Sequence, residues 1–319
     1  MRFLVLLSAL SAFFTSAAPQ QFLVFGDMPY TPVDEALLSA PDGQLYQAVQ
    51  QTPHLFVAHV GDMKSGATPC TDELLQGNYA MLDALSEKPL VYTPGDNDWT
   101  DCDRKTLNPT FDELERLAFV RSQFATAQLP LANYSRQPEQ PENQAWRIDD
   151  VQYVTLHVVG TNNARAQVFS SNAQTALAQT QKRDALNKHW LAQHTAGQAK
   201  EVGSDALAPA AVVIFIQADI YQHNNYGPAC SAQKQTLCDG LNQYQVLFDE
   251  LAKQSDIPVL LVHGDTAEFC FSRRESGLWH LNAPGDFRVL DIAQVTVNTQ
   301  SDEVFSLTTL LGAAPSQCE

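Results

Sequence analysis

Short apolar runs recur along the chain, and most are apolar at consecutive positions rather than at alternate ones. Runs of this kind are typical of β-strands that are buried on both faces. They predict strands at Phe22–Phe25, Leu55–Val60, Leu90–Tyr92, Val151–Val159, Val212–Ile216 and Val259–Val262. The stretches between them predict helices over Leu45–Gln50, Asp72–Leu85, Phe111–Phe124, Ala173–His194 and Leu241–Gln254. The repeated alternation of strand and helix indicates a layered α/β fold.

The pattern changes towards the C-terminus. Phe287–Val297 and Val304–Leu310 are rich in β-forming residues and are separated only by Asn298–Glu303, which predicts an antiparallel pair joined by a turn. Two other segments, Ser135–Gln144 and Thr195–Pro209, are polar and contain Pro or Gly. We therefore expect surface loops at these two places.

Residues 1–18 have the layout of a secretory signal, in which a short basic start precedes the apolar run Phe3–Phe14 and a group of small residues. The run is shorter than the roughly 20 apolar residues of a membrane-spanning helix. We expect cleavage near Ala17 or Ala18, with a retained N-terminal anchor as the alternative. No internal repeat or domain boundary is visible, so residues 19–319 are predicted to form one secreted or periplasmic domain that does not contact the membrane.

The chain is strongly acidic, with 36 acidic residues against 19 basic ones and a formal net charge of −17. A surface of this charge repels nucleic acids and anionic lipids, which excludes both as expected partners. A site that handles phosphate groups would need its own source of positive charge. Bound metal ions are the obvious source.

Six cysteines fit an oxidising compartment. They allow many pairings, and the sequence alone does not choose among them. We predict Cys70–Cys102, Cys230–Cys238 and Cys270–Cys318, because each pair joins loops that the strand order would bring close. A zinc site is the weaker interpretation, since no Cys-x-x-Cys spacing occurs.

Four predicted strands end in the same dipeptide, Gly-Asp. The aspartates of these endings are Asp27, Asp62, Asp96 and Asp265. In layered α/β folds, ligands bind outside the carboxyl ends of the strands, so we expect the four side chains to converge on one crevice. A single Gly-Asp is a common turn or helix cap, but four of them, each ending a hydrophobic strand, favour a site. Carboxylates held together repel one another unless cations are present, so the sequence predicts a divalent metal site.

The order and spacing of these motifs resemble the calcineurin-like metallophosphoesterase superfamily over most of the mature chain. In that superfamily Asp-x-His, Gly-Asp, Gly-Asn-His-Glu/Asp, a lone His and Gly-His-x-His each follow a strand. The matching positions here are Asp27, Asp62, Pro94–Asp98, Gln217 and Gly264–Ala267. The resemblance implies a four-layer αββα sandwich with two central mixed β-sheets and the site at the strand ends. The pattern looks like a divergent secreted bacterial branch of the superfamily.

All five histidines of these superfamily motifs are replaced here. The replacing residues are Pro29, Asn97, Gln217, Asp265 and Ala267, and Asp96 stands where the superfamily has Asn. The candidate metal ligands that the resemblance leaves are nearly all oxygen donors: Asp27, Asp62, Asp96, Gln217 and Asp265. Such a set favours Mg²⁺, Mn²⁺ or Ca²⁺ over Zn²⁺.

The two metal positions that the resemblance implies are unequally supplied. The second position would draw on Asp62, Asp96, Gln217 and Asp265. The first position keeps only Asp27 and shares Asp62 with the second. Tyr30 could be a further ligand there. Of one or two ions per chain, we expect one that is well bound and another that is weak or absent.

Candidate catalytic residues are His263, Asn97 and Asp98. Asn97 and Asp98 lie in the motif that carries the catalytic His of the superfamily. By strand alternation His263 would face the same side as Asp265, and a satisfied core histidine is the alternative. Further side chains that could contact a substrate are His223, Asn162, Asn163, Lys64 and Arg104. For the last two, solvated surface charges are the alternative.

The sequence thus predicts a secreted metal-dependent hydrolase of phosphoric mono- or diesters, with metal-bound hydroxide as the nucleophile and a small phosphorylated substrate. The alternative is a catalytically weak or inactive homologue that binds a metal or a phosphorylated ligand. We favour the enzyme, because random decay would hardly place two further carboxylates at ligand positions.

Overall fold

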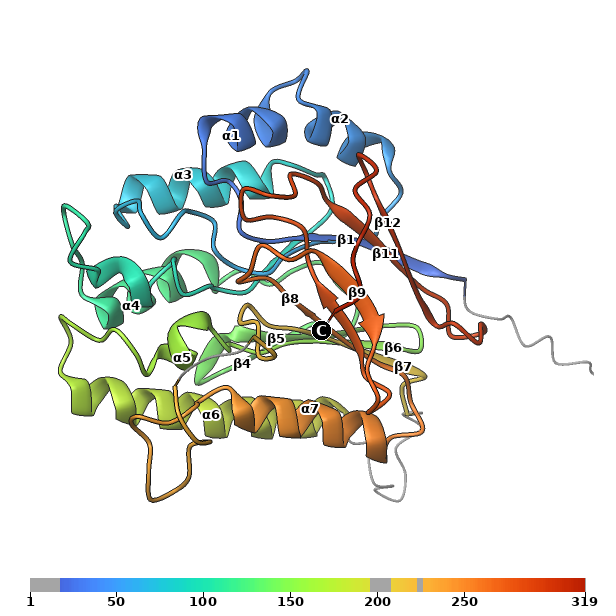
Figure 1. The fold of residues 1–319 in the computed structure, drawn as a ribbon. Helices are drawn as coiled ribbons and strands as arrows, with labels where there is room; N and C mark the ends of the chain where they lie inside the picture. Colours follow the sequence, from blue (N-terminus) through green and yellow to red (C-terminus); the bar gives the residue numbers. More distant parts are fainter. Residues whose placement is uncertain (1–17, 196–207, 223–225, 319) are drawn as a thin grey trace, which may run out of the picture.

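The computed structural model describes residues 18–195, 208–222 and 226–318, and this part of the chain forms four layers (Figure 1). Two β-sheets lie in the middle, with helices on the outside of each. The helices α1 (Pro32–Ser39), α2 (Gln44–Gln51) and α3 (Asp72–Asp83) lie on one side, and α4 (Glu113–Phe124) packs against α3 at the end of the sheets. The long helices α6 (Ala173–Thr195) and α7 (Asn242–Gln254) lie on the other. The predicted fold class, an αββα sandwich with two mixed sheets, is confirmed by this arrangement.

Each sheet combines parallel and antiparallel neighbours. The first sheet has the order β12 (Phe305–Thr309), β11 (Ala293–Val297), β1 (Gln20–Phe25), β2 (Val57–His59) and β3 (Leu90–Tyr92). The second has the order β4 (Ser135–Gln137), β5 (Gln140–Ile148), β6 (Val151–Thr155), β7 (Ala211–Phe215), β8 (Val259–His263), β10 (Trp279–Asn282) and β9 (Cys270–Arg273). The runs β1–β2–β3 and β6–β7–β8–β10 are parallel, so their carboxyl ends lie at one edge of each sheet.

The largest core fills the space between the two sheets. Aromatic side chains from both sheets meet there: Phe22 stacks on Phe56 with ring centroids 5.1 Å apart, and Trp146 stacks on Tyr153 at 5.2 Å. Burying one such side chain stabilises the fold by about 1.5–3 kcal/mol. Each sheet also packs against its own helices through a further hydrophobic core. Because both faces of the central strands are covered, these strands are apolar at consecutive positions.

Most elements form where the sequence predicts them. The helix starts are explained by side-chain caps: Thr31 and Asp34 form a capping box on α1, Thr71 caps α3 and Asp112 caps α4. The predicted antiparallel pair near the C-terminus is confirmed as β11 and β12.

The prediction of a surface loop over Ser135–Gln144 is wrong. These residues form β4 and the first half of β5, and most of the side chains in β5 are buried although they are polar. They are accepted inside the protein because they have partners. The Glu142 carboxylate accepts hydrogen bonds from Arg121 and lies 2.6 Å from Nδ1 of His157, and Asn143 donates to Asn187.

The three predicted disulfides, Cys70–Cys102, Cys230–Cys238 and Cys270–Cys318, are confirmed. They fit an oxidising, extracytoplasmic compartment. No helix among the described residues is long and apolar enough to cross a membrane. The predicted signal peptide lies outside the described residues except for Ala18, as do His223 and most of the segment Thr195–Pro209.

Candidate functional site

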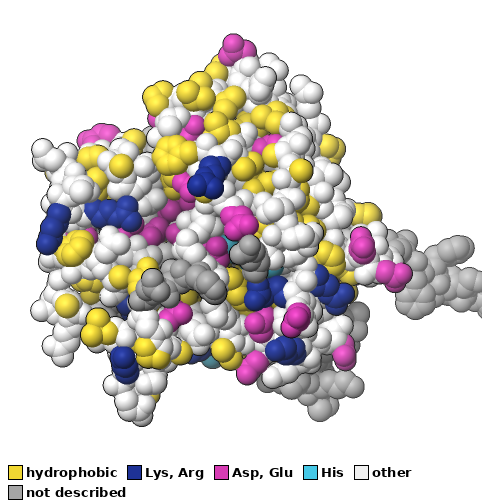
Figure 2. Space-filling model, viewed as in Figure 1, with side chains coloured by type: hydrophobic (Ala, Val, Ile, Leu, Met, Phe, Trp, Pro, Cys, Tyr) yellow, Lys and Arg dark blue, Asp and Glu magenta, His cyan; other side chains and the backbone are white. Residues whose placement is uncertain are grey.

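The four Gly-Asp endings converge on one open cavity of about 260 Å³. Asp27, Asp62 and Asp96 follow β1, β2 and β3 of the first sheet, and Asp265 follows β8 of the second. The cavity is lined by these four residues together with Tyr30, Ser65, Gly66, Ala67, Asn97, Arg104, Asp286 and Phe287. Figure 2 shows acidic side chains gathered around a hollow on this face, with basic side chains nearby.

Three of these aspartates adopt a left-handed backbone conformation, with φ of 54° at Asp27, 59° at Asp62 and 75° at Asp265. Non-glycine residues rarely adopt this conformation, and it turns each carboxylate away from the strand direction. At two of the endings the glycine of the dipeptide is required because there is no space for a side chain. A Cβ atom on Gly95 would collide with Asp62, and one on Gly264 would collide with Asp27 Oδ2. Glycine is therefore needed where the carboxylate of another strand packs against the backbone.

Carboxylate oxygens of Asp62, Asp96 and Asp265 lie within 4.8 Å of one another. Asp27 lies beside them, because its Oδ2 accepts the backbone N–H of Asp265 at 3.1 Å. Its Oδ1 accepts the hydroxyl of Tyr30, also at 3.1 Å. The structure therefore brings together all four aspartates that the sequence singles out.

Burial makes this cluster costly to ionise. It raises the pKa of Asp27 to about 8, and it raises the pKa values of Asp62 and Asp265 well above their usual range, with further contributions from the neighbouring aspartates. Burial also raises the pKa of Tyr30 well above 10, so its hydroxyl remains a donor. The cluster must therefore hold either protons or a cation.

Gln217 lies among three of these carboxylates. Its side-chain nitrogen donates to Asp62 Oδ2 at 3.1 Å, and to Asp96 Oδ1 and Asp265 Oδ1 at 3.2 and 3.1 Å. Its side-chain oxygen accepts the backbone N–H of Gly160 at 2.6 Å, which fixes this orientation of the amide. Three carboxylates whose oxygens meet in this way are ligands that a hard divalent cation takes, although here the Gln217 NH₂ group lies among them. Gln217 does not fit the ligand role expected for it unless its amide turns over, because its oxygen faces Gly160.

The segment that holds Gln217 is a short left-handed turn, α5 (Gly160–Ala164). Its residues Thr161 to Ala164 all have φ between 51° and 58°. Side-chain bonds maintain this strained turn: Thr161 donates to Asp96 Oδ2 at 2.6 Å, and Asn162 and Asn163 bond to Cys238 and Asp184. The two asparagines therefore hold the turn, and neither is among the residues that line the cavity.

Asn97 and Asp98 have different surroundings. Asn97 lines the cavity, and both its backbone and side-chain nitrogens donate to Asp62 at 3.0 Å. Asp98 is fully buried and does not line the cavity. Its carboxylate accepts bonds from the backbone nitrogens of Asp62, Met63 and Gly95 and from the hydroxyl of Tyr92. Asp98 is thus placed to hold the loops that carry the cavity.

His263 is fully buried and faces away from the acidic cavity. Its Nδ1 lies 2.8 Å from the carbonyl oxygen of Gly264, and its Nε2 faces His280. The strand alternation assumed for it fails because β8 ends at His263 and the backbone turns at Asp265. No histidine of the described residues lines the acidic cavity.

Lys64 and Arg104 are not the solvated surface charges that the alternative interpretation of the sequence expects. Lys64 is buried, and burial lowers its pKa. Arg104 lines the cavity and forms an ion pair with Asp101. Asp101 and Thr161 do not line the cavity, but they bind Arg104 and Asp96, which do, and the sequence does not single out either of them. Asp101 follows Asp96 in the same acidic loop, which is a usable signal, whereas nothing in the sequence marks the contact of Thr161.

Comparisons with known proteins give likeness in fold only. No family model matches the chain, and no curated protein matches its sequence. Similar solved structures include a dimetal phosphatase from Danio rerio (13% identity, 91% of this chain and 98% of that chain, TM-score 0.42). They also include a 5′-nucleotidase from Candida albicans (10%, 92% and 52%, TM-score 0.45) and GAP50, the anchor in the inner membrane complex of Plasmodium (11%, 94% and 90%, TM-score 0.43). Likeness at these values assigns neither an activity nor a ligand.

Proposed function

We propose that the protein is a divalent-cation-dependent phosphoric ester hydrolase that acts outside the cytoplasm. The observation that carries this proposal is the meeting of Asp62, Asp96 and Asp265 in one open cavity. Oxygen ligands of this kind suit Mg²⁺, Mn²⁺ or Ca²⁺. When bound, such a cation would supply the positive charge that polarises a phosphoryl group in an otherwise acidic cavity.

The residues around the cluster support binding of a phosphoric ester. The Arg104 guanidinium lines the cavity, and its remaining donors can bind a phosphate oxygen. Asn97 holds the Asp62 carboxylate in place through two hydrogen bonds. Phe287 is 56% exposed and its ring lies 4.9 Å from that of Tyr30, so it offers an apolar wall to the alcohol part of the ester.

A second candidate function is binding of a cation or phosphorylated ligand without turnover. Two observations favour it: no described histidine lines the cavity, and the Gln217 amide donates to three of the carboxylates. The first leaves the site without a histidine as general acid. The second replaces an expected metal ligand by a hydrogen-bond donor.

The mature chain, loaded in turn with Mg²⁺, Mn²⁺ or Ca²⁺, would be assayed with p-nitrophenyl phosphate and bis(p-nitrophenyl) phosphate, and its metal content measured. We expect turnover that Asp62→Asn reduces to background. Asp42→Asn, which makes the same charge change at an exposed site, should leave turnover intact. Metal binding without turnover on either ester would favour the second candidate. Failure to bind any of the three ions would overturn the proposed hydrolase and every form of the second candidate that needs a cation.

A further inference from the structure

A second cluster of potential metal ligands lies on the other side of the β8 ending. His263 ends β8, His280 lies on the neighbouring strand β10, and Asp219 follows β7. One ligand atom from each of the three residues lies within 4.8 Å of the others. The cluster borders a separate cavity of about 670 Å³, which His280 and Asp219 help to line.

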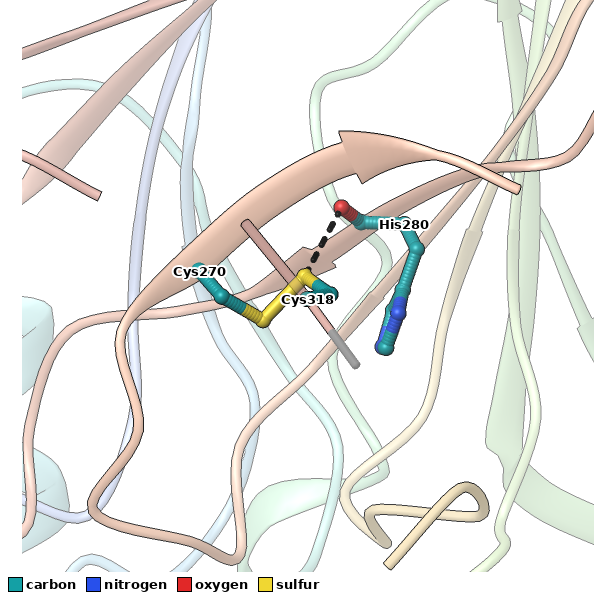
Figure 3. Close-up of side chains that lie close together, drawn as sticks. All are labelled: Cys270, His280 and Cys318. Carbon is teal, nitrogen blue, oxygen red and sulfur yellow. Dashed lines mark hydrogen bonds between the residues drawn. A yellow bond between two sulfur atoms is a disulfide. The ribbon is translucent and has the colours of Figure 1, made fainter. Parts of the chain in front are cut away.

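Sulfur ligation is not available here. Cys270 and Cys318 also lie close to His280, but Figure 3 shows the two sulfurs bonded to each other. Cys318 Sγ lies 3.5 Å from the carbonyl oxygen of His280, and a disulfide sulfur has no proton to donate and no thiolate to offer a metal. The disulfide instead fixes β9 and the C-terminal segment beside β10.

The two imidazoles present nitrogen atoms to each other. His263 Nδ1 lies 2.8 Å from the carbonyl oxygen of Gly264, which can only accept, so Nδ1 donates and Nε2 of His263 has a lone pair. That lone pair accepts a hydrogen bond from Nε2–H of His280 at 2.5 Å, and a bound metal would take the place of this proton. Bonding of one ring nitrogen to a backbone carbonyl is the usual way in which a protein orients a metal-binding histidine.

Asp219 completes the group with an oxygen. Its Oδ1 lies 4.0 Å from His263 Nε2 and is fixed by the backbone nitrogens of Tyr221 and Gln222, both at 3.0 Å. Its Oδ2 accepts the hydroxyl of Thr266, also at 3.0 Å. Hydrogen bonds to a ligating carboxylate are a recurrent feature of metal sites.

One more oxygen donor lines the same cavity. Asn282 donates its side-chain nitrogen to Thr266 at 2.6 Å, while its Oδ1 is buried and has no hydrogen-bond partner among the described residues. A buried carbonyl oxygen without a donor costs free energy, and a cation or its bound water would supply the missing interaction.

We propose that Asp219, His263 and His280 form a transition-metal site, distinct from the acidic cavity and suited to Zn²⁺. Two imidazoles and a carboxylate are a borderline-soft set, which favours Zn²⁺ over Mg²⁺ or Ca²⁺. In a tetrahedral zinc site with bonds of about 2.0–2.1 Å, the two imidazole nitrogens lie about 3.3 Å apart. The rings need to separate by less than about 1 Å from their present 2.5 Å, and Asp219 Oδ1 needs to approach His263 Nε2 by a similar amount from 4.0 Å.

The site can be tested with Co²⁺, because the visible absorption of bound Co²⁺ depends on the number and geometry of its ligands. Zn²⁺ would then compete with Co²⁺ for the site. The full mature chain would be freed of metal with a chelator and titrated with Co²⁺. We expect one equivalent with tetrahedral absorption, displaced by Zn²⁺ and lost in His280→Ala and Asp219→Asn. His54→Ala, which removes a histidine far from both cavities, should leave the signal unchanged. An equal signal in His280→Ala, or no tetrahedral Co²⁺ in the wild type, would overturn the site.

Two further measurements keep the outcome clear. Asp62→Asn should retain the Co²⁺ signal, so the zinc site and the proposed hydrolase can fail independently. If His280→Ala does not fold, electron paramagnetic resonance of Cu²⁺ bound to the wild type answers instead. Hyperfine lines from two imidazole nitrogens are expected, and lines from one or none would show that the two histidines are only hydrogen-bonded to each other.

Discussion

Asp98 connects the ends of two strands through a single buried carboxylate. It accepts the backbone N–H groups of Asp62 and Met63 after β2, and that of Gly95 after β3. In Asp98→Asn an amide NH₂ group would face one or more of these donors, so we expect the free energy of unfolding to fall by about 2–4 kcal/mol. Urea unfolding measures this, with Asp42→Asn as the matched surface change. If Asp98→Asn lowers the free energy of unfolding no more than the control does, the hydrogen bonds of Asp98 do not stabilise these loops.

Gly95 is predicted to be irreplaceable for a different reason, which is space. A Cβ atom there would overlap the Asp62 side chain, so Gly95→Ala should displace that carboxylate and lower divalent-cation affinity by about 10-fold or more. Gly77 provides the control, because a Cβ atom at this position in α3 meets nothing within 4 Å. Gly77→Ala should keep the affinity and raise stability by up to about 1 kcal/mol. Equal cation affinity in both variants, measured by titration calorimetry, would contradict the prediction.

The carboxylates could be predicted from the sequence because each directly follows a recognisable strand. Gln217 could be placed in the site in the same way, but not its orientation. The direction of its amide depends on the Gly160 N–H, which a left-handed turn brings from a distant part of the chain. His263 was misplaced because alternation along a strand says nothing beyond the residue where the strand ends.

Among the secondary-structure elements, those with apolar faces were predictable and those with buried polar faces were not. β3 agrees with its prediction at both ends because it is a short apolar run. β5 was missed because its inward side chains include Glu142 and Gln144, which are buried only through partners on other elements. Such pairings are tertiary, so no local pattern in the sequence reports them.

The Cys70–Cys102 disulfide joins the segment after β2 to a short 3₁₀ helix after β3, η1 (Thr100–Asp103). It spans 32 residues, whereas Cys230–Cys238 spans 8. Loop-closure entropy then predicts that removal of the first with paired alanines costs about 4 kcal/mol, against about 2.5 kcal/mol for the second. Only removal of Cys70–Cys102 should also weaken cation binding, because both of its sulfurs lie within 4 Å of the carbonyl oxygen of Asn97, which lines the acidic cavity. Thermal unfolding and cation titration of the two double variants measure this, and equal losses in both properties would contradict it.

At the scale of the whole molecule, the two sheets and the acidic surface act together. The sheets bring the ends of β1, β2 and β3 to the same cavity as the end of β8, so four carboxylates meet although they are distant in sequence. The formal net charge of −17 attracts cations from solution towards this cavity and repels free anions. A phosphoric ester would therefore approach most readily when a cation is already bound.

The same burial that shapes the core makes the protein sensitive to acid. His59 is fully buried, its Nε2 donates to the carbonyl oxygen of Met28, and burial lowers its pKa to about 4. In the unfolded chain its pKa is about 6.5, so between these values the unfolded state binds the proton and the folded state does not. The contribution of neutral His59 to the free energy of unfolding is therefore complete above pH 6.5 and is lost as the pH falls towards 4.

His59→Gln can keep the bond to Met28 without titrating. The difference in free energy of unfolding between the wild type and this variant should therefore shift by about 2–3 kcal/mol in favour of the variant between pH 7 and pH 4.5. Urea unfolding at the two pH values, in the same salt and cation concentration, measures the shift and cancels the contribution of the acidic cavity. His189→Gln, at an exposed position of α6, controls for loss of a histidine in itself. A constant difference for His59→Gln would show that the folded protein accommodates a protonated His59, and that its burial does not set the acid limit of the fold.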